Sequence, residues 1–389
     1  MKTWIAVALG MAARLVWVVV GTDRVTLDAA GYRVLAHSLA GGHGYATASG
    51  PSAYWMPGWP AWMAIVYRFG GDGLIVLMNV ALGGATVMAT WALARELLPD
   101  APEVARIAAS VCALTPSLVL LPRLLLSENL ALPLFTFATL ALAVACRTRL
   151  LRHWALFSIA AAAATFVRES SGAIVLAGLV FALCRPHHST SKARVLAALV
   201  VVCAFSLAAL PWMVRNRAAL GVTTLSTSAG VNLCIGLGDG ATGGYRVIHA
   251  GRVDAAEVER HELGLQCAKE GLAHHPMVVL TLVPAKLSRL MAWDDWIVDD
   301  FLASEPSLPR PVLAVLRVLC DGFYWALCIG AIASAYRMPR SRMTRVAYAV
   351  IASVAVVVLM TFGAGRFHTP ILPLLAVLAA SGWCYRRAS

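Results

Sequence analysis

The chain has 389 residues, of which 60% are hydrophobic and 13% are charged, and its mean hydropathy is +0.74. A soluble core could not bury this much apolar surface, so the composition excludes a soluble globular protein. The net charge of +12 would indicate nucleic-acid binding in a soluble chain. Most of this excess lies in short clusters between apolar segments, where it acts as a topology signal, so we predict no nucleic-acid partner.

Ten apolar segments along the chain predict an all-α, polytopic membrane protein with about ten transmembrane helices. The first segment resembles a signal peptide, but Arg14 interrupts it and no small-residue cleavage pattern follows Val20, which favours an uncleaved helix. The segments are 3–20, 74–94, 107–126, 130–146, 154–167, 172–184, 195–214, 318–336, 346–362 and 369–385.

Basic clusters predict the orientation of these helices, because loops rich in Lys and Arg stay in the cytoplasm. The clusters comprise Arg147, Arg149 and Arg152; Arg185, Lys192 and Arg194; Arg337, Arg340, Arg342 and Arg345; and Arg386 with Arg387. An even number of crossings must separate any two clusters, so both termini are expected in the cytoplasm. Counting His275 to Trp293 as a span would break this parity, so we interpret that segment as an interfacial or re-entrant helix.

The same parity predicts one transmembrane domain over residues 1–389 with two large extracytoplasmic loops. The first loop covers residues 21–73 and the second covers residues 215–311. In the first loop, apolar residues from Tyr32 to Leu39 follow helical spacing, which predicts an amphipathic juxtamembrane helix. Asp28 lies at its start, where it could cap the helix or act as a general base, and these two roles are compatible.

Further charged residues cluster at the same outer ends of the helices. Glu128 alone would be ordinary loop solvation, and Arg168 with Glu169 could be a structural ion pair. Charge at the end of a membrane helix is costly, however, and the accumulation of these groups predicts a functional site on the extracytoplasmic face. Its members are Asp28, Glu128, Arg168, Arg215, Arg217 and Arg366.

The order and spacing of several motifs resemble a known family. The motifs are Asp28, Tyr32, Leu35, Ala36, Leu39, Gly42, Gly44 and Tyr45; Tyr54, Pro57, Gly58, Trp59 and Pro60; Leu126, Ser127 and Glu128; Pro211, Trp212, Arg215 and Asn216; Gly221, Ser226, Thr227, Gly230, Asn232, Leu233, Gly236, Gly243, Gly244 and Tyr245; and Arg366, Phe367, Pro370 and Pro373. The chain resembles the GT-C membrane glycosyltransferases that use polyprenyl-phosphate sugars, in particular bacterial relatives of protein O-mannosyltransferases and aminoarabinose transferases. An acidic residue usually follows the first-loop Asp in this family, whereas Ala29 follows Asp28 here. This departure from the family pattern argues against a metal site shared by two adjacent acids.

The resemblance implies a GT-C-like fold and an inverting transfer of a monosaccharide from a polyprenyl phosphate. The phosphate leaves without protonation, so one general base is sufficient, and Asp28 is the candidate. Arg215 and Arg366 are candidates for binding the donor phosphate, with Arg168 as a third. Glu128 would orient the acceptor or the arginines, or help to bind a divalent cation. Candidates for the substrate pocket are Tyr32, Tyr54, Trp59, Asn232 and Tyr245.

The implied partners are a polyprenyl-phosphate-linked sugar and the lipids of a bacterial plasma membrane. The acceptor is not identified; a lipid, a glycan, a peptide or a secreted small molecule would fit, and the end of the chain at Ser389 without an appended soluble domain slightly disfavours a large folded protein. A transporter or lipid flippase and an O-antigen-type polymerase or ligase remain alternatives.

Cys234 and Cys267 share the second loop and would pair in an oxidising compartment, a question that the sequence leaves open.

Overall fold

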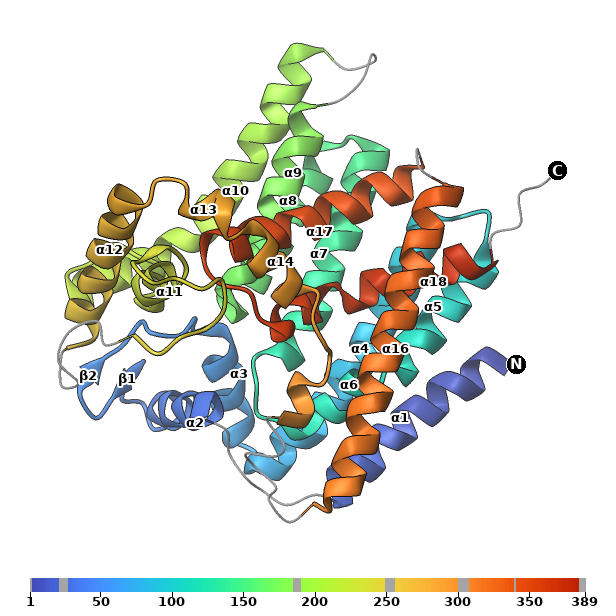
Figure 1. Cartoon of the computed structure of the whole chain (residues 1–389), viewed down its shortest axis with the longest axis horizontal. Helices are drawn as coiled ribbons and strands as arrows, with labels where there is room; N and C mark the ends of the chain where they lie inside the picture. Colours follow the sequence, from blue (N-terminus) through green and yellow to red (C-terminus); the bar gives the residue numbers. More distant parts are fainter. Residues whose placement is uncertain are drawn as a thin grey trace.

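The computed structural model describes residues 2–20, 27–184, 190–248, 256–299, 308–338 and 341–384. The described residues are predominantly helical, as predicted (Figure 1). The elements are α1 (Lys2–Val20), α2 (Leu27–Ala40), β1 (Ala46–Thr47), β2 (Gly50–Pro51), α3 (Gly58–Tyr67), α4 (Asp72–Leu97), α5 (Pro102–Leu114), α6 (Pro116–Leu120), η1 (Leu121–Arg123), α7 (Glu128–Thr148), α8 (Leu151–Val167), η2 (Glu169–Ala173), α9 (Ile174–Leu183), α10 (Ser191–Leu220), α11 (Ser228–Leu237), α12 (Glu257–His274), α13 (Val278–Thr281), α14 (Val283–Leu290), α16 (Arg310–Arg337), α17 (Arg342–Met360), η3 (Gly365–Ile371) and α18 (Leu372–Cys384).

Helices cover most of each of the ten predicted apolar segments, and residue 385 of the last segment lies outside the described residues. Among the described residues, five helical segments are long and apolar enough to cross a membrane, namely α4, α7, α10, α16 and η3 with α18. The pair α5 and α6–η1, bent by 57°, forms a sixth candidate, and α1, α8, α9 and α17 are apolar but shorter. The chain is therefore a multi-pass membrane protein, and the number of ten spans stays a prediction.

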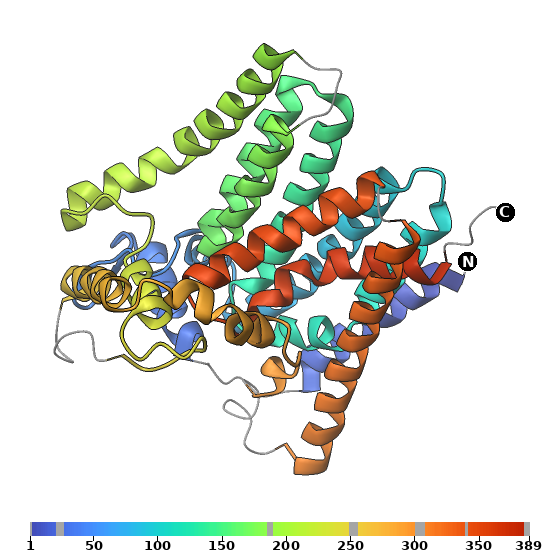
Figure 2. The same ribbon diagram turned by 45° about the horizontal axis from the view of Figure 1, so that its top comes forward.

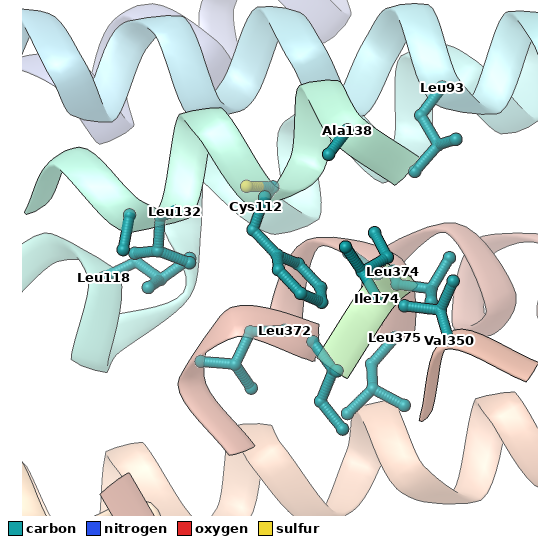
Figure 3. Packing of buried hydrophobic residues seen from close by; sticks show 14 of the residues in the cluster. Leu93, Cys112, Leu118, Leu132, Ala138, Ile174, Val350, Leu372, Leu374 and Leu375 are labelled. Carbon is teal, nitrogen blue, oxygen red and sulfur yellow. The ribbon is translucent and has the colours of Figure 1, made fainter. Parts of the chain in front are cut away.

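Helix α18 lies at the centre of the bundle. It packs against α16, α5 and α4, and its residues from Leu372 to Gly382 are all buried. Figure 3 shows Leu372, Leu374 and Leu375 of this helix beside buried side chains of neighbouring helices. Because α18 is apolar on every face, only a position surrounded by other helices buries all of it.

The outer helices α10 and α16 have the opposite character. Both carry large apolar side chains that the protein does not cover, including Leu207 and Leu210 on α10 and Val318 and Ile329 on α16. Figure 2 shows α10 as a long helix at the edge of the molecule. Apolar side chains at the rim of a membrane protein face lipid, so the bundle is apolar inside and outside.

The polar loops assemble at one end of the bundle, around α2, α3, α11 and α12. The amphipathic helix predicted in the first loop is α2, but its apolar face packs on protein: Tyr32, Leu35 and Ala36 are buried, and α2 contacts α3. Cys234 and Cys267 form a disulfide that joins α11 to α12.

Residues 275–293 form the short helices α13 and α14, and neither belongs to the candidate membrane spans. This agrees with the parity argument that excluded a span here. Four residues of the predicted basic clusters, namely Arg185, Arg340, Arg386 and Arg387, lie outside the described residues, as do residues 21–26, 249–255 and 300–307 of the two predicted loops.

Candidate active site

A single guanidinium joins the two acids that the sequence singles out. Arg366 donates from Nη1 to Asp28 Oδ2 at 2.7 Å, and it donates to Glu128 from Nε and, at 3.2 Å, from Nη2. The side chain of Asp28 is 40% exposed, whereas that of Glu128 is 1% exposed. The two carboxylates therefore share one cation, but only Asp28 is open to a ligand from solution.

Arg168 completes a network of four alternating charges. Its Nη1 lies 2.6 Å from Glu128 Oε1, and the guanidinium is stacked near the ring of Phe367. Glu128 thus pairs with two arginines, which compensates the cost of burying its charge. The alternative pairing of Arg168 with Glu169 does not form, because the structure turns Glu169 toward α11.

Tyr32 connects this network to helix α2. Its hydroxyl donates to Ser127 Oγ at 3.3 Å, and Ser127 in turn donates to Glu128 Oε2 at the same distance. Burial raises the pKa of Tyr32 to about 12, with Arg366 opposing and Asp28 and Glu128 adding to this effect. Tyr32 is therefore a protonated hydrogen-bond donor at neutral pH.

Buried polar contacts hold the segment that ends in Ser127 and Glu128. Trp59 donates its indole N–H to the carbonyl of Leu125 at 3.1 Å, and Asn129 donates to the carbonyl of Leu124 at 2.8 Å. Trp59 is completely buried, so in this structure it supports the segment rather than offering a surface to a substrate. Its predicted position in the pocket therefore gains no support from its contacts.

The segment that carries Arg366 is fixed by contacts with distant parts of the chain. Gly363 donates to the carbonyl of Gly243 at 2.9 Å in a short parallel pairing. A Cβ at Gly363 would lie 2.3 Å from the carbonyl oxygen of Lys286, so only glycine allows this approach. The second loop is thereby held against the residues that lead into η3.

A buried histidine anchors the other side of Arg366. His368 is fully buried and lies 3.0 Å through Nε2 from Asp294 Oδ1 and 2.9 Å through Nδ1 from the carbonyl of Leu290. It also stacks on Tyr324 at 4.3 Å. Both ring nitrogens therefore have a partner, and the ring is held from two sides. Neither residue carries a sequence signal for this pairing, because the two are 74 residues apart in the chain.

Arg215 lies in a different set of contacts. It donates from Nη1 to the carbonyl of Ser52 at 2.6 Å and from Nη2 to the carbonyl of Tyr45 at 2.7 Å. Its guanidinium also lies over the rings of Tyr45 and Trp212. These contacts fasten the β1–β2 hairpin to the end of α10, and the structure does not place Arg215 in the network of Arg366.

The remaining pocket candidates lie on the side of the second loop. Asn232 donates to Glu169 Oε1 at 3.0 Å, and Tyr245 is exposed and contacts the ring of Phe362. Tyr54 is partly buried. Burial raises the pKa of Tyr54, and the charge of Asp28 contributes to the same effect. Tyr54 therefore lies within electrostatic reach of the candidate base.

A divalent cation would need ligands that these acids do not provide freely. Among the described residues, no group of three His, Cys, Asp or Glu side chains is arranged to hold a metal ion. Arg366 occupies the space between Asp28 and Glu128, where a cation shared by both carboxylates would bind. The arrangement does not fit such a metal site.

Part of the chain resembles a known protein family. Residues 49–212 match the family model described as dolichyl-phosphate-mannose-protein mannosyltransferase. This segment contains Glu128 and Arg168. No curated protein gives a significant match to the chain.

Two solved structures from Archaeoglobus fulgidus share the fold. The oligosaccharyltransferase AglB in complex with an inhibitory peptide and a dolichol-phosphate is 15% identical with a TM-score of 0.58, and the match covers 98% of this chain and 50% of that one. The oligosaccharyltransferase complex with Zn and sulfate is 14% identical with a TM-score of 0.56, covering 98% and 48%. The chain thus spans about half the length of these proteins.

The fold is therefore that of the GT-C membrane enzymes. The family match over residues 49–212 agrees with it, which confirms the resemblance expected from the motifs. The family model covers residues 49–212, less than half of the chain, and the two solved structures show a shared fold.

Proposed function

We propose that this protein transfers a monosaccharide from a polyprenyl phosphate to an acceptor hydroxyl, by a single displacement with inversion at the anomeric carbon. The observation that carries the proposal is the bridge that Arg366 forms between exposed Asp28 and buried Glu128. This bridge supports the proposal because the reaction requires a base and a cation for the departing phosphate, and a carboxylate beside a guanidinium can supply both.

Asp28 is the general base in this mechanism. It takes the proton of the acceptor hydroxyl as the acceptor oxygen bonds to the anomeric carbon, and the bond from that carbon to the phosphate oxygen breaks with its electron pair on the phosphate. The ion pair with Arg366 holds the carboxylate in a fixed orientation. Its 40% exposure leaves room for the acceptor to reach it.

Arg366 and Arg168 stabilise the phosphate that departs. A guanidinium has five N–H groups, and three of those of Arg366 donate to Asp28 and Glu128. We assign the others to the donor phosphate, whose oxygens match the planar fork. Arg168 adds a second positive charge beside Glu128.

Glu128 acts as a positioning residue rather than as a catalytic one. It is almost completely buried and is held by two arginines, so a substrate does not reach it. Its charge keeps both guanidinium groups in place before the substrate binds. This arrangement pre-organises the cations for the charge that develops on the leaving group.

We further propose that the site lies on the extracytoplasmic face of a bacterial plasma membrane, with both termini in the cytoplasm. The positions of the basic clusters support this orientation. The disulfide between Cys234 and Cys267 supports it independently, because disulfides persist in oxidising compartments. A neighbour of similar fold was solved with a dolichol-phosphate, which supports a polyprenyl-phosphate partner.

The proposal is tested with purified protein, radiolabelled polyprenyl-phosphate sugars and a membrane extract as the source of acceptors. Transfer of label by the wild type and its loss in Asp28→Asn support the mechanism, and full transfer by that variant removes the proposed base. A lipid-linked oligosaccharide in a parallel reaction separates single-sugar transfer from oligosaccharide transfer. Uptake into proteoliposomes without any transfer would favour the transporter or flippase alternative.

A further inference from the structure

A third carboxylate lies beside the network, and the proposed displacement does not use it. Glu169 directly follows Arg168, so the chain brings it next to a residue that pairs with Glu128. It does not pair with that arginine. Its side chain turns instead toward α11 and is only partly buried.

The contacts of Glu169 define its orientation. Oε1 accepts from Asn232 Nδ2 at 3.0 Å and from Ser228 Oγ at 3.3 Å. A carboxylate offers about four acceptor positions on its two oxygens. Ser226 is a third hydrogen-bond partner; burial raises the pKa of the Glu169 carboxyl, and the hydrogen bonds with Ser226, Ser228 and Asn232 oppose this rise. The two measured hydrogen bonds both end on Oε1, so Oε2 retains acceptor positions for a ligand.

Tyr54 lies in the neighbourhood of this carboxylate. Burial raises the pKa of its phenol, the charges of Asp28 and Glu169 add to this rise, and that of Arg260 opposes it. Tyr54 is also tied to the same region through its backbone, since its carbonyl accepts from Ser226 Oγ at 2.8 Å. The hydroxyl of Ser226 also lies 2.7 Å from that of Ser228, which donates to Glu169, so a chain of hydrogen bonds connects Tyr54 to this carboxylate.

The chemistry of these groups selects one part of the donor. Glu169 only accepts hydrogen bonds when it is ionised, and Asn232 uses its amide N–H on Glu169, which leaves its amide oxygen as an acceptor. Such a set repels a phosphate and attracts a ligand that brings several donors. The hydroxyl groups of a sugar ring have this property.

We propose that Glu169, Asn232 and Tyr54 form a subsite that binds the hydroxyl groups of the donor sugar. The inference rests on the proposed function, and it divides the donor between two sets of residues. Arg366 and Arg168 bind the phosphate, and Glu169 with its neighbours binds the sugar. Glu169 thus determines which glycosyl groups the protein accepts.

A purely structural role would have Glu169 fasten α11 to the end of α8. The variant Glu169→Gln separates the two roles, because glutamine keeps a side-chain oxygen for Asn232 and Ser228 but loses the charge. Glu262→Gln is the matched control, since Glu262 lies exposed on α12. Both variants are compared with the wild type for thermal unfolding in the same detergent.

Binding is then measured by titration calorimetry with two kinds of lipid: polyprenyl phosphate without sugar, and a panel of polyprenyl-phosphate hexoses. For the hexose that the wild type binds most tightly, Glu169→Gln is expected to weaken binding about tenfold to a hundredfold, as for loss of a hydrogen bond to a charged group. Its affinity for the sugar-free lipid should stay within about twofold, and Glu262→Gln should change neither affinity.

Each other outcome has a distinct meaning. The subsite is overturned if Glu169→Gln weakens the binding of both lipids equally, if its lower unfolding temperature accounts for the weaker binding, or if its affinity for the hexose-bearing lipid is unchanged. The proposed function stays intact in each of these cases. A wild type that binds the sugar-free lipid as tightly as every hexose-bearing lipid also overturns the subsite. A wild type that binds neither lipid overturns the proposed function itself.

Discussion

Arg366 and Asp28 are 338 residues apart in the chain, yet Nη1 of the arginine donates to Oδ2 of the aspartate at 2.7 Å. The contact joins helix α2 to η3, the segment that directly precedes the last helix, α18. It determines which of the two candidate acids reaches a ligand, because the same arginine also holds Glu128 inside the protein.

The first prediction concerns the base. Asp28→Asn should lower sugar transfer about 10²-fold to 10⁴-fold, the usual contribution of general base catalysis, while donor binding is retained. The measurement is initial transfer rate together with donor affinity. Asp239→Asn, at an exposed aspartate that contacts His274, is the control and should transfer at the wild-type rate. Loss of donor affinity equal to the loss of rate would contradict the assignment.

A second prediction separates Glu128 from Asp28 by stability. Glu128→Gln leaves Arg366 and Arg168 without their buried counter-charge and should lower the free energy of unfolding by about 3–5 kcal/mol. Asp28→Asn changes an exposed group, so its effect should be about 1 kcal/mol or less. Chemical denaturation in detergent compares the two variants. A free energy of unfolding for Glu128→Gln equal to that for Asp28→Asn would contradict this prediction.

The third prediction separates two arginines that the sequence treats alike. Arg366→Lys should weaken binding of polyprenyl phosphate at least about tenfold, because an ammonium does not reproduce the fork that spans both acids. Arg215→Lys should leave this affinity within about twofold, since Arg215 holds the carbonyls of Tyr45 and Ser52. Its effect should instead be faster proteolysis in the β1–β2 hairpin. The reverse pattern would restore Arg215 as the phosphate ligand.

The disulfide gives a fourth prediction, which also tests the orientation. Cys234 and Cys267 are 33 residues apart, and the chain-entropy model assigns about 3–4 kcal/mol to closing such a loop. Replacing both by serine should therefore destabilise the second loop. In intact cells, a membrane-impermeant maleimide should label the two thiols of the wild type only after reduction. Labelling without a reductant, or only after lysis, would contradict the proposed arrangement.

The fifth prediction concerns the buried Lys286 on α14. Burial lowers the pKa of Lys286 to about 8 from its usual 10.5, and its ammonium donates to the carbonyl of Leu359 at 2.6 Å. Between these two pH values the unfolded chain binds more protons than the folded protein, so stability should rise with pH. The unfolding temperature of wild type relative to Lys286→Met, measured from pH 8 to 9.5, should therefore increase. A flat difference would show that the lysine stays hydrated.

Several features follow from local sequence patterns. Apolar segments of membrane length predicted the helices, since burying backbone polar groups in lipid leaves few other structures. The spacing from Tyr32 to Leu39 predicted α2, because side chains three and four apart share one face. Asp28, Glu128, Arg168 and Arg366 were also recognisable, because charges at helix ends are unusual in a membrane protein.

The roles of these residues were decided by tertiary structure. Nothing local distinguishes Arg366 from Arg215, yet one meets two carboxylates and the other meets two backbone carbonyls. Likewise Glu169 looked like a partner for Arg168 and instead accepts hydrogen bonds from α11. The His368–Asp294 pair carried no sequence signal, because two buried groups at distant positions are not ordered by any local periodicity.

The sequence by itself determined a helical membrane protein with acids and arginines at the ends of its helices, since hydrophobicity and helical periodicity act over a few neighbouring residues. Only the tertiary structure decided that Arg366 joins Asp28 to Glu128 and that Asp28 alone stays open. The reason is physical: electrostatic and hydrogen-bonding partners are chosen by distance in space, and the packing of the helices around α18 sets that distance.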